Sequence, residues 1–155
     1  MGKAHDKDLK KFLKDFPPEL GKTALWLRDF MWELYPDCNE LIYDNYNALA
    51  FGWGLSDKLG DVFCAVAVYG SGVNFGFNRG TEIPDAKKIL LGNGKLFRFV
   101  RADKEVDFPK AEVKKLLKYA YTNAKMRMKA KNQKQELKGI TIVKSISPKR
   151  KRPKK

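Results

Sequence analysis

The chain has 155 residues, 43% of them hydrophobic, and a formal net charge of +14. This length and apolar content suit a single domain with one hydrophobic core rather than two domains. The longest apolar run, 62–69, is too short to cross a bilayer as a helix, and the N-terminus lacks the apolar stretch of a signal peptide. A cytoplasmic protein with no membrane partner is therefore expected.

The positive charge is concentrated in the last third of the chain. Residues 1–109 contain 15 Lys or Arg and 16 Asp or Glu, whereas residues 110–155 contain 17 and 2. The two cysteines, Cys38 and Cys64, have neither a zinc-ligand spacing nor that of a disulfide framework. The sequence thus predicts a nearly neutral body followed by a polycationic end.

Two helices are predicted before the first strand. Residues 7–16 favour a short charged helix that Pro17 and Pro18 terminate. Residues 18–35 have apolar side chains at steps of three and four, which predicts an amphipathic helix that ends before Pro36. The apolar stripe of this helix consists of Leu20, Ala24, Leu27, Met31 and Leu34.

Short segments rich in β-branched and aromatic residues then predict strands at 40–45, 47–54, 62–69, 73–78 and 95–102. The segment 62–69 is apolar on both faces, so we place it in the centre of the sheet. A tight turn at 70–72 leads into the next strand, where Phe75 and Phe77 alternate with polar or small residues. A short helix is expected at 85–90.

The last long helix begins after Phe108 and Pro109, with a stripe of Val113, Leu117, Ala120, Ala124 and Met128. The predicted class is α+β, with an antiparallel sheet of about five strands and the two long helices on one face. The predicted organisation is a helical lead at 1–17, an α+β domain at 18–129 and a basic, disordered tail at 130–155. Within that tail, the apolar residues 140–143 allow an additional edge strand.

Several motifs in the middle of the chain resemble the YdhG-like domain family. They are Tyr43 in the first strand, the GFNRG turn at 76–80, the Pro-Asp segment after it, and GNGK at 92–95 followed by Arg98. The resemblance covers roughly residues 18–125 and excludes the basic end. It implies helices packed on an antiparallel sheet. The family is one of unknown function, and because some members are described as frataxin-like iron chaperones, the resemblance also implies iron handling as an alternative.

A polar patch is predicted on strand faces and strand ends. It consists of Tyr43, Tyr46, Asn74, Asn78, Arg79, Lys95 and Arg98. Arg offers a forked donor array and Tyr a flat surface with a polar tip, so this set suits a small anionic or planar ligand. The alternative is an ordinary solvated sheet face, because a register error of one residue moves every side chain to the other face.

Acidic side chains gather on the second helix, away from its apolar stripe, and continue into the first strand: Asp29, Glu33, Asp37, Glu40 and Asp44. Clustered carboxylates suit hard cations such as iron, calcium or magnesium, so Asp29, Glu33 and Asp37 form a candidate metal site. The prediction is a protein without a cofactor, with iron, which the family resemblance implies, as the alternative. The alternative is a charged helix face that Lys22 and Arg28 partly neutralise.

Catalytic constellations are not evident, and we predict a non-enzymatic protein. The lone histidine, His5, lies near the N-terminus, where it does not complete a Ser-His-Asp or Cys-His arrangement. The GNGK segment fails as a phosphate-binding Walker motif, because Ile89 replaces the first Gly and Leu96 the final Ser or Thr. We expect a structural turn there.

The basic end is the strongest signal in the sequence. Its last seven residues contain six cations, Lys149, Arg150, Lys151, Arg152, Lys154 and Lys155. These follow Lys110, Lys114, Lys115, Lys118, Lys125, Arg127, Lys129, Lys131, Lys134 and Lys138. Such density binds polyphosphate backbones by counterion release without reading sequence, so nonspecific nucleic-acid contacts are predicted. Base stacking is not evident, and a merely solubilising tail is the alternative.

Overall fold

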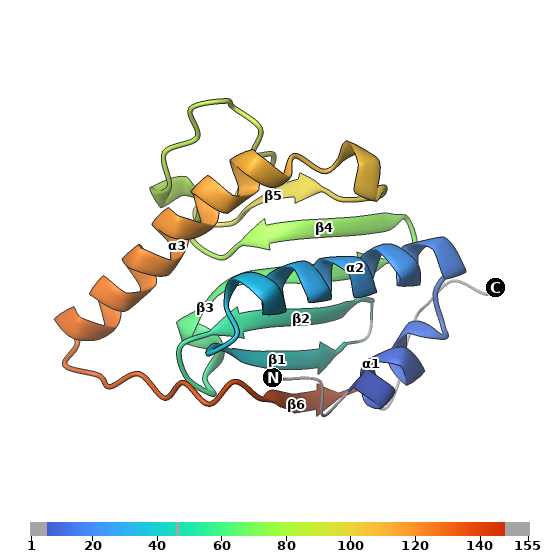
Figure 1. Ribbon diagram of the computed structural model, residues 1–155, viewed down its shortest axis with the longest axis horizontal. Helices are drawn as coiled ribbons and strands as arrows, with labels where there is room; N and C mark the ends of the chain where they lie inside the picture. The colour runs from blue at the N-terminus through green and yellow to red at the C-terminus, as the bar shows by residue number, and fades with distance from the viewer. Residues whose placement is uncertain (1–5, 46, 148–155) are drawn as a thin grey trace.

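The computed structural model describes residues 6–45 and 47–147 and shows helices in front of a single sheet (Figure 1). In chain order the main elements are α1 (Asp6–Leu13), α2 (Pro18–Leu34), β1 (Asn39–Asp44), β2 (Leu49–Gly54), β3 (Val62–Tyr69), β4 (Gly72–Phe77), β5 (Arg98–Arg101), α3 (Lys110–Ala130) and β6 (Thr141–Ile146). The described residues also form three short 3-10 helices: η2 (Leu59–Asp61), η3 (Gly80–Glu82) and η4 (Glu105–Asp107).

The sheet has six strands in the order β5-β4-β3-β2-β1-β6. Neighbouring strands are antiparallel except β6, which pairs in parallel with β1. The predicted α+β class is confirmed, but the sheet is mixed rather than antiparallel, with one strand more than predicted. The parallel pair arises because the chain leaves β5 at one edge, crosses the sheet through α3, and returns at the opposite edge (Figure 1).

The core lies between the sheet and the helices. Alternate residues of the strands, such as Phe51, Val66 and Phe75, are fully buried on the helix side. Both predicted helix stripes contribute to it, with Leu27 of α2 and Leu117 of α3 fully buried. The apolar side chains of α1 belong to the same cluster, so the helical lead is part of the domain. In the described part of the chain, no helix has the length and apolarity needed to cross a membrane.

The connection between β4 and β5 differs from the prediction. The expected short helix at 85–90 is absent, and β5 begins only at Arg98. The Asp85 carboxylate instead accepts hydrogen bonds from the backbone N–H groups of Ile89 (3.0 Å) and Leu90 (2.9 Å). Side-chain acceptors of this kind offer the backbone a turn in place of a helix, and here they stabilise an irregular loop.

The segment after α3 also differs from the predicted tail. The backbone N–H of Glu136 donates to the carbonyl of Leu55 (2.7 Å), and the Asn39 side chain bonds to the backbone of Glu136 (2.7 Å) and Lys138 (2.9 Å). The edge strand that the apolar residues 140–143 allowed is present as β6. The ordered domain therefore extends through Ile146, and the tail residues 148–155 lie outside the described part.

Candidate functional site

The predicted ligand patch is divided between the two faces of the sheet. In the β4–β5 ladder, Asn74 lies opposite Arg101, and Phe77 lies opposite Arg98. Directly opposed residues share a face, and residues three apart along a strand do not. Asn74 therefore projects from the open face, whereas Arg98 shares the face of buried Phe77.

Tyr43 does share the open face with Asn74, but at a distance. The ladder runs from Tyr43 through Ala50 and Ala67 to Asn74, so three strand spacings separate the two side chains. At about 4.8 Å per strand this is roughly 14 Å. The two residues can only act together on a ligand that spans the alanines between them.

The other predicted patch residues lie near the loop at 78–98. Arg79 forms an exposed ion pair with Glu82 (2.7 Å), and the Arg98 guanidinium donates to the carbonyls of Gly94 (2.6 Å) and Phe97 (2.7 Å). The Asn78 backbone N–H donates to the carbonyl of Phe63 (3.2 Å), and Lys95 is exposed. Tyr46 lies outside the described residues. The geometry therefore does not assemble these side chains into one site.

The residues of the predicted metal site are not brought together either. Within residues 6–45 and 47–147, no three His, Cys, Asp or Glu residues come together as a metal-binding group. Asp29, Glu33 and Asp37 are exposed. Glu40 points instead into the interior, where it is fully buried.

Arg28 and Glu40 form a buried ion pair that links three elements. The Arg28 Nη2 lies 2.8 Å from Glu40 Oε1, and Nε lies 2.9 Å from Oε2. The Thr141 hydroxyl donates to Glu40 Oε1 (2.7 Å) and accepts from Arg28 Nη2 (3.2 Å). The two charged side chains are 1% and 0% exposed. This cluster ties α2 to β1 and β6 and has a structural role.

The strongest cationic surface belongs to α3. Four exposed lysines, Lys114, Lys118, Lys125 and Lys129, follow one face of the helix at steps of four, seven and four. We call this set the lysine stripe. At 1.5 Å per residue it extends about 22 Å. No side chain of the lysine stripe has an ion pair or hydrogen bond with another described residue.

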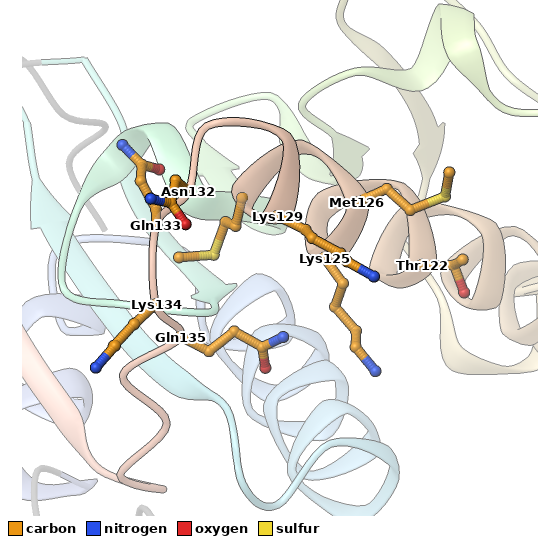
Figure 2. A pocket seen from close by; sticks show the side chains of 9 residues that line it. Thr122, Lys125, Met126, Lys129, Asn132, Gln133, Lys134 and Gln135 are labelled. Atoms are coloured by element: carbon orange, nitrogen blue, oxygen red, sulfur yellow. The ribbon is translucent and has the colours of Figure 1, made fainter.

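Two adjoining hollows accompany the lysine stripe. One, of about 630 Å³, lies between the end of α2 and α3 and is lined by Leu34, Tyr35, Lys114, Lys115, Lys118, Tyr121 and Thr122. The other, of about 710 Å³, lies between α3 and residues 132–135 (Figure 2). In Figure 2, Lys125 of α3 and Gln135 of the following segment project toward the space between them. Thr122 lines both hollows, so they form one groove along α3.

The charged residues that line the groove are all positive. Six lysines line its two parts, and none of its described lining residues is acidic. Within the described part of the chain, the ion pair that joins α3 to the rest of the domain is Arg127–Glu82 at 3.6 Å, on another side of the helix. Lys115 is 3.8 Å from Glu112 of its own helix. The four lysines of the lysine stripe are therefore not neutralised by a described carboxylate.

Aromatic side chains form one wall of the groove. The rings of Tyr35 and Tyr121 have centroids 5.0 Å apart, and the buried Phe63 contacts each edge-on at 5.5 Å. Lys125 Nζ lies 5.2 Å from the Tyr121 centroid, within cation–π range. Burial raises the pKa of Tyr35 to about 12, and burial also raises the pKa of Tyr121. Both hydroxyls are therefore neutral donors at physiological pH.

Sequence reasoning identified the α3 lysines but not the groove. The signal for the lysine stripe is present in the sequence, since the four residues keep helical spacing beside the apolar stripe. Tyr35 gives no such signal, because it meets Tyr121 only through the packing of α2 against α3.

Comparison with protein-family models, with curated proteins and with solved structures found no match. The resemblance to the YdhG-like family therefore stays a prediction.

Proposed function

We propose that this protein is a non-enzymatic module that binds nucleic acid through the lysine stripe of α3, without reading its sequence. The observation that supports the proposal is the lysine stripe itself: four exposed cations in line over about 22 Å, none of them ion-paired with a described carboxylate. Lysines attract phosphates as point charges, and neutralising several phosphates releases condensed counterions. The partner is therefore a polyphosphate backbone.

The proposal differs from the sequence-based hypothesis in where the contacts lie. The six cations at 149–155 add to the same charge, but α3 holds the lysine stripe at fixed spacing on a folded surface. Lysines that a folded helix holds at fixed spacing lose little conformational freedom on binding. We therefore assign the main contacts to α3 and an additional nonspecific contribution to residues 148–155.

The test is a salt titration of binding. A fluorescently labelled 20-nucleotide strand is titrated with the protein at several salt concentrations, and anisotropy gives the dissociation constant. Changing all four lysines of the lysine stripe to Gln should weaken binding by more than tenfold at low salt. It should also reduce the slope of log K against log salt by about 3, at about 0.7 per lost single-strand phosphate contact.

A charge-matched variant controls for net charge. Lys10 and Lys11 of α1, Lys14 of the turn after it and Lys22 of α2 are exposed, and changing these four to Gln removes the same number of charges. This variant should keep most of the wild-type slope. A chain that ends at Ser147 keeps β6 and loses the predicted tail contacts. Equal losses in the two lysine variants would refute the proposal, and loss of all binding on truncation alone would return the function to the tail.

A further inference from the structure

The groove beside the lysine stripe contains aromatic rings as well as cations. Tyr35 and Tyr121 line the hollow between α2 and α3 together with Lys114, Lys115 and Lys118. The other side chains that the structure places there are Leu34 and Thr122. A groove of this composition offers phosphate contacts on one side and a flat apolar surface on the other.

We propose that this groove binds single-stranded nucleic acid in preference to a duplex, with an unpaired base against the Tyr35–Tyr121 pair and its phosphates on the lysine stripe. This inference rests on the proposed function and narrows its substrate class. A hollow of about 630 Å³ lies within the size range of pockets that enclose small ligands. Bases in a duplex are stacked inside the helix, whereas a single strand presents its base faces.

The ring pair is held in place before any ligand arrives. Phe63, which is 1% exposed, makes edge-to-face contacts with both tyrosines at 5.5 Å. The tyrosines are half-buried, so a stacked base would cover the remaining ring surface. Lys125 Nζ lies over Tyr121 at 5.2 Å, so a base that stacks on this ring face would displace the lysine side chain, which could then contact the phosphate.

Tyr121 lies between lysines of the lysine stripe along α3. Tyr121 lies three residues after Lys118 and four before Lys125 on α3, so the ring is between two cations of the lysine stripe. Aromatic platforms flanked by cations bind single strands with little sequence preference, because every base has a π-face. The groove therefore distinguishes the form of the nucleic acid and not its sequence.

The experiment uses the full chain and three probes: a labelled 12-nucleotide single strand, the duplex of the same length, and inorganic polyphosphate as a competitor without bases. The wild type should bind the single strand at least fivefold more tightly than the duplex. Tyr121→Leu should reduce single-strand affinity about tenfold, consistent with a stacking contact. Its inhibition by polyphosphate should remain unchanged, because the lysines are intact.

The matched control is Tyr119→Leu, since Tyr119 is an exposed tyrosine on the same helix that lines a different hollow. Tyr121→Phe keeps the ring and should keep the affinity, which separates stacking from the hydroxyl and guards against misfolding. Equal losses for Tyr121→Leu and Tyr119→Leu, or equal affinity for duplex and single strand, would overturn the inference. Polyphosphate binding that persists in that case would leave the proposed function standing, whereas loss of all polyanion binding by the wild type would remove both.

Discussion

The two long helices use their positive charges in opposite ways. On α2, Arg28 is 1% exposed and its guanidinium is paired with Glu40 and Thr141. On α3, the lysine stripe is exposed, and none of its side chains has an ion pair or hydrogen bond with another described residue. The α2 charge is therefore expected to matter for folding and the α3 charges for binding, because a buried charge must be paired and an exposed one need not be.

This contrast teaches that the net charge of +14 is a poor guide to function until each cation is placed. An exposed lysine can be replaced with little effect on stability, whereas loss of one partner leaves a buried charge uncompensated.

The largest effect is expected from breaking the buried ion pair. Arg28→Met leaves the Glu40 carboxylate buried without its cation, which should reduce the free energy of unfolding by about 3–5 kcal/mol. Urea unfolding followed by circular dichroism measures this loss. The double variant Arg28→Met with Glu40→Leu should lose less than Arg28→Met alone, since both charges are gone. A single-variant loss below 1 kcal/mol would show that Glu40 finds another partner.

The sequence predicted most of the fold because its apolar periodicity is strong. The alternation of Phe75 and Phe77 with smaller residues placed β4 with the correct face toward the core. The sheet was predicted one strand too small, because β6 pairs with β1 across about a hundred residues of chain. No local pattern reports such a long-range pairing.

The candidate site was harder to predict than the fold. Arg28 was interpreted as a surface charge, although it lies four residues after Ala24 and four before Trp32, both buried. Helical spacing could have revealed its burial, but not its partners, Glu40 and Thr141, which come from two other elements. The predicted ligand patch combined residues from both faces of the sheet: Arg98 lies opposite Phe77, three residues from Asn74 along β4, so Asn74 and Arg98 are on opposite faces.

The Cys38 thiol, between α2 and β1, should make the free energy of unfolding depend on pH in the alkaline range. Burial, with a smaller effect of Asp37, raises the pKa of the Cys38 thiol from 9.0 to about 12. The unfolded chain therefore ionises first as pH rises, so stability is full below pH 9 and decreases between pH 9 and about 12. At 1.4 kcal/mol per pKa unit the loss from Cys38 reaches about 4 kcal/mol.

Unfolding midpoints in urea at pH 8, 9, 10 and 11 measure this dependence. Cys38→Ala should flatten the curve, although Tyr35, whose pKa is also about 12, keeps part of the slope above pH 10. Parallel curves for the wild type and Cys38→Ala would mean that the thiol does not contribute. The variant with all four lysines of the lysine stripe changed to Gln should lose stability over the same pH range as the wild type, since its changes lie on the exposed face of α3.

A smaller effect is expected at the third member of the buried cluster. Thr141→Val keeps the shape of the side chain but removes the hydroxyl that bonds to Glu40 and Arg28. Hydrogen bonds to charged groups contribute about 1.5–3 kcal/mol, so the free energy of unfolding should fall by about 2 kcal/mol. Ser145→Val on the same strand, at an exposed position, should change it little. Equal effects of the two changes would show that the Thr141 hydroxyl does not stabilise the ion pair.

The smallest effect, and one of opposite sign, is expected from the lysine stripe. Lys114 and Lys118, and also Lys125 and Lys129, are like charges four residues apart on α3, an arrangement that destabilises a helix by about 0.2–0.5 kcal/mol per pair. Gln has nearly the helix propensity of Lys, so changing all four to Gln removes the repulsion together with the cation–π contact of Lys125 with Tyr121 and changes little else. We expect a gain of stability between zero and about 1 kcal/mol, measured by urea unfolding at low salt. In 0.5 M NaCl the gain should shrink, because salt screens exposed charges. A loss of more than 1 kcal/mol would instead show that these lysines stabilise the fold, and the contrast between the two helices would fail, since residues that hold the helix in place cannot be assigned to binding from their exposure alone.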